Sequence, residues 1–354
     1  MFYHVAQALQ SQFKIFNIFH YVSVRVIIAL LSSIVLSFMF GNWFIETSKK
    51  NFRSKVRKWT PQTHESKNDT PTMGGLFIII IFLINALLWA DLSRVQVWIF
   101  IFGIVSFGFI GFTDDFLKIK KNTGLTAKTK FLLQGLFAFL IMILWYFWGD
   151  SDTQVCVPFF KNLSFDLGLF IIPWAVFIIV GASNAVNLTD GLDGLAAGPL
   201  LFNFSTFSII AYLAGHKIFS QYLYIPFAKS AELSVLGAAL VGTLLGFLWY
   251  NTYPAQIFMG DVGSLALGAG LALMAIMTRH ELLLPIAGGI FVLEAASVMI
   301  QVFSFKMYGK RLFKMAPIHH HYELMGWKEA KITVRFWIIS IILSLLTLLT
   351  LKIR

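Results

Sequence analysis

Residues 97–118 read VWIFIFGIVSFGFIGFTDDFLK, an apolar run that ends in two aspartates, Asp114 and Asp115. A helix of roughly 20 apolar residues spans the hydrocarbon core of a bilayer. An ionised carboxylate is too costly to leave beside hydrocarbon without a partner, so acidic residues at the end of a span mark a functional site by default. This stretch therefore predicts a membrane helix with a polar site at its end.

The whole chain has the composition of an integral membrane protein. Of its 354 residues, 58% are hydrophobic and 13% are charged, and this apolar share exceeds that of a soluble domain. The apolar runs do not alternate at period two, as the strands of a membrane β-barrel would. We therefore expect an all-α, polytopic helical bundle that forms one domain over residues 1–354. About ten spans are predicted, centred near Leu31, Phe82, Val105, Leu140, Phe177, Ser205, Val241, Leu271, Leu293 and Leu345.

Lysine and arginine are concentrated in alternate loops, at residues 49–67, 118–130 and 306–335. Positive charge is enriched in cytoplasmic loops, so we expect these loops in the cytosol and, with an even number of helices, both termini outside. The same orientation places the loops after Val186 and Tyr250 on the cytoplasmic side, although lysine and arginine alone determined it. Five aspartates then share one face of the membrane, namely Asp114, Asp115, Asp190, Asp193 and Asp261.

Residues 187–196 read NLTDGLDGLA and precede another apolar span. Glycines let a backbone turn tightly and approach a ligand, and the N–H groups at a helix start attract anions such as phosphate. An ordinary turn between helices explains the glycines but not the packing of Asn187, Asp190 and Asp193 into one loop. We interpret the loop as part of a binding site for an anionic ligand.

Asp261 lies between two glycines in residues 258–264, FMGDVGS. One carboxylate with phosphate oxygens and water is a usual ligand set for Mg²⁺; the alternative is a helix N-cap by Asp261. The repulsion between Asp114 and Asp115 favours a bound cation or a shared proton. For that pair the alternative is a solvated helix end with an ion pair to Lys118, which lies three and four residues further on.

Three consecutive histidines, His319, His320 and His321, follow in the last basic loop. Successive side chains cannot all point to one site on a regular helix or strand, so a zinc site, whose ligands come from spaced positions, is not expected. A histidine here is better suited to donate a hydrogen bond to phosphate or to act as an acid or base. The alternative is a histidine-rich loop in water. Upstream, Lys67 adds a cation before Gly74-Gly75.

In order and spacing these motifs resemble those of the polyprenyl-phosphate N-acetylhexosamine-1-phosphate transferases. The resemblance covers residues 67–326, and its histidine loop and Pro-Thr-Met-Gly-Gly motif look most like the branch of the family that uses UDP-N-acetylmuramoyl-pentapeptide. The motifs that carry it are TPTMGG at 70–75, Asp114-Asp115, residues 187–196, GDVGS at 260–264 and APIHHH at 316–321.

The resemblance implies a reaction of peptidoglycan synthesis at the bacterial cytoplasmic membrane. UDP-N-acetylmuramoyl-pentapeptide arrives from the cytosol, undecaprenyl phosphate lies in the inner leaflet, and attack of the lipid phosphate on the sugar-proximal phosphorus yields lipid I and UMP. Transfer between two anions needs charge neutralisation, which Mg²⁺ and basic side chains supply. A net charge of +11 would also attract both reactants and anionic membrane lipid. No nucleic-acid partner is implied, and a homodimer is left open.

The resemblance also implies roles for single residues. Asp261 is the expected ligand of Mg²⁺. Asp114 is the expected base or nucleophile, and Asp115 tunes its charge. The remaining expected contacts are Lys118 and Lys130 with phosphate; Asn187, Asp190 and Asp193 with the nucleotide sugar; Phe258 with uracil; Gln301 with the substrate; and Lys67, His319, His320 and His321 with the diphosphate or sugar.

Several alternatives stay open. A secondary transporter should show an inverted repeat and charges at matching depths, and neither is clear in the sequence. A sister enzyme that uses UDP-N-acetylglucosamine would share the phosphate chemistry. The ninth span is irregular, with Pro285 and Gly288-Gly289 before Glu294; it is either a groove for the polyprenyl chain or a tilted helix whose Glu294 pairs internally. The sequence does not distinguish one-step transfer from an aspartyl-phosphate intermediate.

Overall fold

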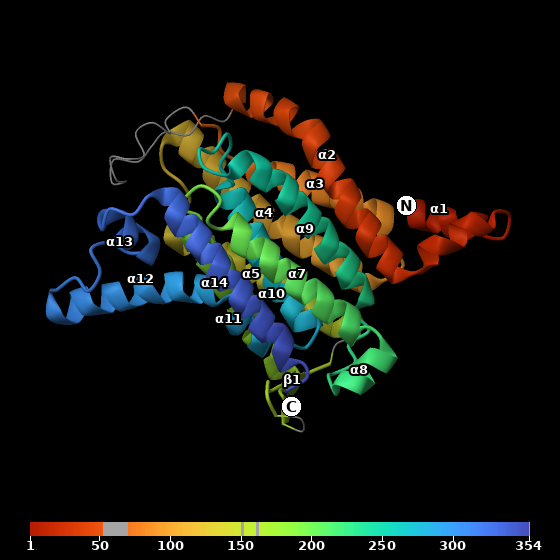
Figure 1. Cartoon of the computed structure of the whole chain (residues 1–354). Coiled ribbons are helices and arrows are strands. Elements are labelled where there is room, and N and C mark those ends of the chain that lie inside the picture. Colours follow the sequence, from red (N-terminus) through yellow and green to blue (C-terminus); the bar gives the residue numbers. More distant parts are fainter. Residues whose placement is uncertain (52–69, 150–151, 161–162, 354) are drawn as a thin grey trace.

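The structure is a computed structural model of the chain, and it describes residues 1–51, 70–149, 152–160 and 163–353. Long helices run side by side through most of the molecule (Figure 1), which confirms the prediction of an all-α polytopic bundle. Every predicted span corresponds to a helix: α2 (Val22–Asn51), α3 (Gly74–Trp89), α4 (Val95–Lys121), α5 (Ala127–Trp148), α6 (Ile171–Thr189), α7 (Ala197–Ala214), α9 (Ala231–Asn251), α10 (Gly260–Met277), α12 (Gly289–Tyr308) and α14 (Glu329–Thr350).

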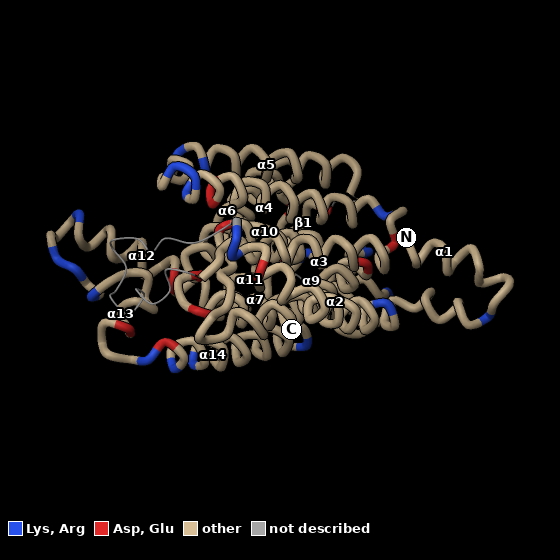
Figure 2. Tube along the Cα trace, turned by 90° about the horizontal axis from the view of Figure 1, so that it is seen from above, with Lys and Arg blue, Asp and Glu red and all other residues tan. Residues whose placement is uncertain are grey.

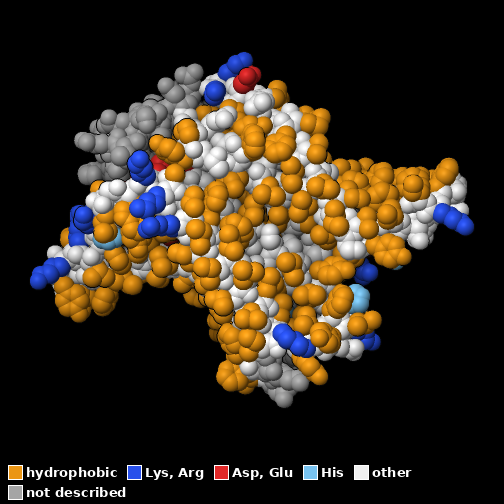
Figure 3. Space-filling view, in the orientation of Figure 1, with side chains coloured by type: hydrophobic (Ala, Val, Ile, Leu, Met, Phe, Trp, Pro, Cys, Tyr) orange, Lys and Arg blue, Asp and Glu red, His pale blue; other side chains and the backbone are white. Residues whose placement is uncertain are grey.

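Within the described part of the chain, nine of these helices are long and apolar enough to cross a membrane, and α3, with 16 residues, is shorter. Hydrophobic side chains cover most of the lateral surface that Figure 3 shows, as lipid contact requires. The remaining elements are short: α1 (Phe2–Leu9), η1 (Lys14–His20), the antiparallel strands β1 (Gln154–Cys156) and β2 (Ser164–Asp166), η3 (Gly168–Phe170), α8 (Lys217–Leu223), η4 (Glu281–Leu283), α11 (Leu284–Ala287) and α13 (Ile318–Leu324).

Helix α10 is the centre of the bundle and packs against α3, α4, α6 and α7. Of the 18 residues of α10, 89% are buried inside the bundle. Small residues allow the close packing of membrane helices: a Cβ added at Gly111 of α4 would collide with the carbonyl oxygen of Asp261. The end of α4 that carries Asp114 and Asp115 is therefore held directly against the start of α10.

Helix α12 leaves the bundle at an angle and projects to one side (Figure 1). Only 22% of the residues in its most apolar 18-residue stretch are buried inside the molecule. The chain breaks before it, because α11 begins with a proline in its first turn and ends at Ala287, and Gly288 separates the two helices. The prediction of an irregular ninth span is confirmed, and the carboxylate of Glu294 does have an internal partner, His319, at 3.1 Å.

Lysine and arginine gather at the end of the bundle near α12, α13 and the connection between α4 and α5 (Figure 2). The N-terminus, before α1, and the C-terminus, after α14, lie away from that end of the bundle (Figure 1). The charge asymmetry that the sequence shows is thus an asymmetry of the folded molecule. The assignment of the basic end to the cytosol stays a prediction.

Candidate active site

The segments that carry the predicted carboxylates meet at the basic end of the bundle. Asp114 and Asp115 lie in the last turns of α4, and Asp261 lies in the first turn of α10. One carboxylate oxygen from each of the three lies within 4.8 Å of the other two. Asp114 and Asp115 are buried, with 3% and 5% of their surface exposed. The structure therefore brings together residues that are almost 150 positions apart in sequence.

Two lysines neutralise part of this charge. The Nζ of Lys118 lies 2.7 Å from Asp114 Oδ2, 3.2 Å from Asp115 Oδ1 and 2.9 Å from Asp261 Oδ2. The Nζ of Lys130 lies 2.6 Å from Asp261 Oδ2. The helical spacing between Lys118 and the aspartate pair predicts the first two contacts, and the structure confirms them. With all five groups ionised, the cluster keeps one negative charge in excess.

The carboxylates are also held by backbone N–H groups. Asp114 Oδ1 accepts a hydrogen bond from Leu125 N at 2.6 Å, and Asp115 Oδ2 accepts one from Val262 N at 3.3 Å. The second bond places a negative charge at the N-terminus of α10, where the helix dipole favours it. Asp261 itself lies inside the first turn, and Met259 is the N-cap residue. Asp261 therefore does not cap α10 and keeps its carboxylate for the cluster.

The last turn of α6 and the residue that follows it join the cluster through Asn187 and Asp190. Asn187 Nδ2 donates to Asp261 Oδ1 and to Ser264 Oγ, both at 2.9 Å. Desolvation, together with the negative charges of Asp261, Asp115 and Asp193, raises the pKa of the Asp190 carboxyl to about 8. A carboxyl with this pKa is protonated at neutral pH unless a cation or another positive group comes near it.

Asp193 is placed differently from Asp190. It is 3% exposed, and its Oδ2 accepts a hydrogen bond from Ala255 N at 2.9 Å. Its carboxylate thus joins the loop after α6 to the loop between α9 and α10. Sequence reasoning missed Asn251, at the end of α9, whose Oδ1 accepts from Gly194 N at 3.1 Å. A polar residue at the end of an apolar span is the same signal that identified the aspartates.

The segment 70–75 acts as a clip on the start of α10. Phe258 N donates to Pro71 O at 2.9 Å, and Gly74 N and Gly75 N donate to Phe258 O and Met259 O, each at 2.8 Å. A Cβ added at Gly75 would collide with the backbone nitrogen of Gly263. This motif therefore fixes the residues that precede Asp261. Lys67 lies outside the described residues.

The three histidines lie on or next to the short helix α13 and have three different partners. His319 is fully buried, with Nδ1 3.1 Å from Glu294 Oε2. His320 Nδ1 lies 2.6 Å from Glu323 Oε2, and His321 Nδ1 accepts a hydrogen bond from Lys314 N at 3.1 Å. The rings of His319 and His320 lie next to each other, with centroids 4.1 Å apart, but the three histidines share no common hydrogen-bond partner.

Gln301 and Phe258 also have defined places. Gln301 Oε1 accepts from Leu312 N and Phe313 N, at 3.1 and 2.9 Å, and its Nε2 donates to Phe313 O at 3.0 Å. Its side chain therefore shapes the turn after α12. Phe258 is half-buried and contributes its backbone to the clip with residues 70–75. Contact of either side chain with substrate stays a prediction.

The carboxylate cluster has the donor set of a hard divalent cation. Oxygen ligands from one or two carboxylates, completed by water and phosphate, are typical of Mg²⁺ sites. Asp114, Asp115 and Asp261 supply three such oxygens, and the excess negative charge favours a further cation. The cluster is able to bind a metal ion.

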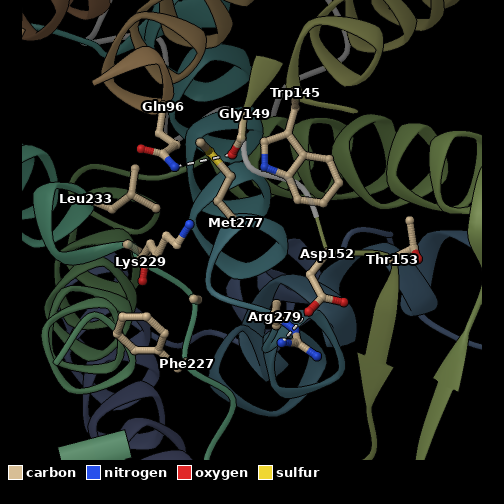
Figure 4. Close-up of a pocket in the computed structure, with 12 residues that line it drawn as sticks. Gln96, Trp145, Gly149, Asp152, Thr153, Phe227, Lys229, Leu233, Met277 and Arg279 are labelled. Carbon is tan, nitrogen blue, oxygen red and sulfur yellow. Dashed lines mark hydrogen bonds and ion pairs between the residues drawn. The ribbon is translucent and has the colours of Figure 1, made fainter. Parts of the chain in front are cut away.

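A cavity of about 320 Å³ lies at the other end of the bundle (Figure 4). Its lining includes Gln96 near the start of α4 and Met277 at the end of α10. Since α10 has 18 residues, roughly 27 Å of helix separates it from Asp261. Arg279 in its wall pairs with Asp152 at 2.7 Å. The cavity is separate from the carboxylate cluster.

Comparison with known proteins gives consistent matches. Residues 97–279 match the model of glycosyl transferase family 4, and residues 67–79 match signature 1 of the phospho-N-acetylmuramoyl-pentapeptide-transferases. The chain is 48% identical over 358 residues to the phospho-N-acetylmuramoyl-pentapeptide-transferase of Citrifermentans bemidjiense, with 100% of both chains covered. It is 50% identical over 348 residues to the protein of that name from Rickettsia massiliae, with 96% of both chains covered.

Proposed function

This chain belongs to the phospho-N-acetylmuramoyl-pentapeptide-transferase family, and on that premise we propose that it transfers phospho-N-acetylmuramoyl-pentapeptide to undecaprenyl phosphate. The donor is UDP-N-acetylmuramoyl-pentapeptide, and the products are lipid I and UMP. One observation carries the proposal: three carboxylates and two lysines from separate segments meet where an apolar bundle ends. A water-soluble anionic donor and a lipid-anchored anionic acceptor meet at such a boundary.

Asp261 is the proposed ligand of Mg²⁺. Its Oδ2 lies near both lysines of the cluster, and its Oδ1 accepts from Asn187, so the carboxylate is held in a fixed orientation. When bound, Mg²⁺ would neutralise charge on the donor diphosphate and on the transferring phosphoryl group. The lysine ammonium groups are positioned to exchange a carboxylate oxygen for a phosphate oxygen as the donor arrives.

Asp114 is the proposed base. It takes a proton from the lipid phosphate, a phosphate oxygen then bonds to the sugar-proximal phosphorus, and the bond from that phosphorus to the oxygen of UMP breaks. Lys118, whose ammonium group contacts both Asp114 and Asp115, screens the repulsion between the two carboxylates and stabilises their charge. In the alternative mechanism Asp114 attacks the phosphorus itself and forms an aspartyl-phosphate.

The last turn of α6 and the loop after it form the proposed nucleotide-sugar site. Asn187 and Asp190 lie beside Asp261, so a donor held there would present its diphosphate to the cluster. Asp193 shapes this site through its bond to Ala255 N. The other substrate contacts are proposed as the family resemblance implies them, for Phe258, Gln301, Lys67 and the three histidines.

Helix α12 is the proposed contact for the polyprenyl chain. It projects from the bundle and exposes large apolar side chains, among them Leu293, Met299 and Phe303. The lysine and arginine distribution supports an orientation in the bacterial cytoplasmic membrane with the carboxylate cluster toward the cytosol. The acceptor in the inner leaflet and the donor in the cytosol would then reach the cluster from adjacent sides.

The test is a transfer assay with purified protein, undecaprenyl phosphate and each of two nucleotide sugars. We expect lipid I and UMP from UDP-N-acetylmuramoyl-pentapeptide with added Mg²⁺, and a strong loss of both products when a chelator removes the metal. Transfer from UDP-N-acetylglucosamine alone would overturn the substrate and leave the phosphoryl-transfer site intact. No transfer from either donor would overturn the function.

A further inference from the structure

The peptide groups of Asp193 and Gly194 lie in the turn between α6 and α7, where no regular backbone ladder pairs them. Buried backbone groups need partners, and here four side chains supply them, with one additional backbone hydrogen bond from Gly198 N to Gly194 O at 3.2 Å. Asp193 N donates to Glu329 Oε1 at 2.7 Å, and Gly194 N donates to Asn251 Oδ1 at 3.1 Å. Asp193 O accepts from Thr333 Oγ1 at 3.3 Å, and Gly194 O accepts from Trp337 Nε1 at 3.0 Å.

Three of these four partners come from one helix, α14. Glu329, Thr333 and Trp337 are spaced four residues apart, so they lie on the same face of α14 over its first turns. Trp337 also packs on the start of α7, where a Cβ added at Gly198 would collide with the indole ring. One face of α14 therefore holds both the turn and the helix that follows it.

The turn has little conformational preference of its own for this shape. Gly194 has a φ of +71°, a conformation that glycine adopts and exchanges easily. The hydrogen bonds from α14 and α9 select it. The turn begins with Asp190 and follows directly on Asn187 in the last turn of α6. Both residues lie beside Asp261, so a shift of the turn would move Asp190 relative to the carboxylate cluster.

We propose that Glu329, Thr333 and Trp337 are positioning residues for the nucleotide-sugar loop, an inference that rests on the proposed function. They act on the reaction through the backbone of Asp193 and Gly194 rather than by contact with the reacting atoms. Without their hydrogen bonds the loop samples more conformations, and only one of these binds the donor productively. The expected effect is a higher KM for the donor nucleotide with an unchanged KM for undecaprenyl phosphate.

The experiment compares substitutions that each remove one hydrogen-bonding group facing the turn and leave an apolar side chain in its place. Thr333→Val, Trp337→Phe and Glu329→Leu should lower kcat/KM for the donor by about 10- to 100-fold, because small misplacements of binding groups have effects of that order. Glu329→Gln keeps an oxygen that can accept from Asp193 N, so it should restore most of the activity. Ser340→Ala is the matched control, since Ser340 is buried on α14 and its hydroxyl has no hydrogen-bond partner among the described residues.

A second measurement does not depend on the identity of the substrates. Amide hydrogen exchange of residues 190–196 should be faster in the three variants than in the wild type and the Ser340→Ala control, while exchange in the middle of α10 stays unchanged. Faster exchange throughout the molecule would show general destabilisation and overturn a specific positioning role. Unchanged exchange at 190–196, or an unchanged donor KM in an active enzyme, would also overturn it. If the wild type transfers nothing, the proposed function fails. The positioning role is then tested by amide hydrogen exchange alone, recorded with UMP as the bound probe.

Discussion

The ammonium group of Lys130 lies 2.6 Å from a carboxylate oxygen of Asp261, 131 residues further along the chain. Lys118 approaches the same oxygen at 2.9 Å, and Asn187 bonds to the other one. Asp261 is therefore the residue on which α4, α5, α6 and α10 converge. A metal ion bound at Asp261 would compete with the lysines for the same oxygen, so binding of the metal would be linked to release of an ammonium group.

Removal of the Asp261 charge should abolish Mg²⁺-dependent transfer. Asp261→Asn keeps the shape of the side chain and its contact with Asn187, but it removes the charge that holds the cation and both lysines. We expect a loss of at least about 100-fold in kcat at every Mg²⁺ concentration, with the protein still folded. Asp166→Asn, on the exposed strand β2, is the control. Near-normal activity with an unchanged Mg²⁺ requirement in Asp261→Asn would move the metal site elsewhere.

Substitution of Asp114 separates the two mechanisms. If Asp114 only deprotonates the lipid phosphate, Asp114→Asn should be slow at neutral pH and partly recover as the pH rises, because the second pKa of a phosphate is near ~6. Rates of product formation between mildly acidic and alkaline pH provide the measurement. Recovery of a phosphorylated Asp114 by mass spectrometry, from wild-type protein and donor alone, would instead establish the covalent route.

The raised pKa of Asp190 predicts a pH-dependent stability in the absence of metal. In the unfolded chain this carboxyl loses its proton near its ordinary pKa, whereas in the folded protein the pKa is about 8. Between about pH 4 and pH 8 the folded state thus holds the extra proton, so its stability falls as the pH rises through this range. Thermal unfolding of the metal-free protein should show this fall, and it should be smaller in Asp190→Asn. Identical slopes for the two proteins would contradict the prediction.

The close approach of Gly75 and Gly263 predicts a large effect of a single methyl group. Gly75→Ala places a Cβ against the backbone of α10, and overpacking of this kind destabilises by about 1–3 kcal/mol. Gly135→Ala is the matched control, because a Cβ there meets nothing within 4 Å and alanine favours the helix. Thermal unfolding in detergent should separate the two variants in opposite directions from the wild type. Equal melting temperatures would show that the contact between residues 70–75 and α10 does not constrain the structure.

Single-cysteine labelling tests the orientation in the membrane. In a background without Cys156, Asn122→Cys and Lys328→Cys should react only with a reagent added to the cytosolic side, and Lys217→Cys only with one added outside. All three positions are exposed, so accessibility from the labelled side is not limiting. Labelling of positions 122 and 217 from the same side would contradict the topology.

Hydropathy and charge were sufficient to predict the spans and the convergence of Asp114, Asp115, Asp190 and Asp261, because both follow from the cost of placing charge in hydrocarbon. They did not predict the hydrogen-bond partners of the Asp193 and His319 side chains. The first turns to Ala255 N and the second to Glu294, and neither partner is near in sequence. The pairing of residues 71–75 with Phe258 and Met259 was missed for the same reason: backbone contacts between distant segments leave no periodic signal in the chain.

The separation of Asp114 from Asp261 in the sequence also determines when the site can form during synthesis. The two residues are about 147 positions apart, and a ribosome that adds 5–20 residues each second needs roughly 7–30 s to cover that distance. For this interval the nascent chain already carries α4, with its acidic end and Lys118, but lacks the helix that completes the cluster. The carboxylate cluster is therefore incomplete throughout most of insertion, and it gains its third carboxylate only after α10, the eighth of the ten predicted spans, has been made.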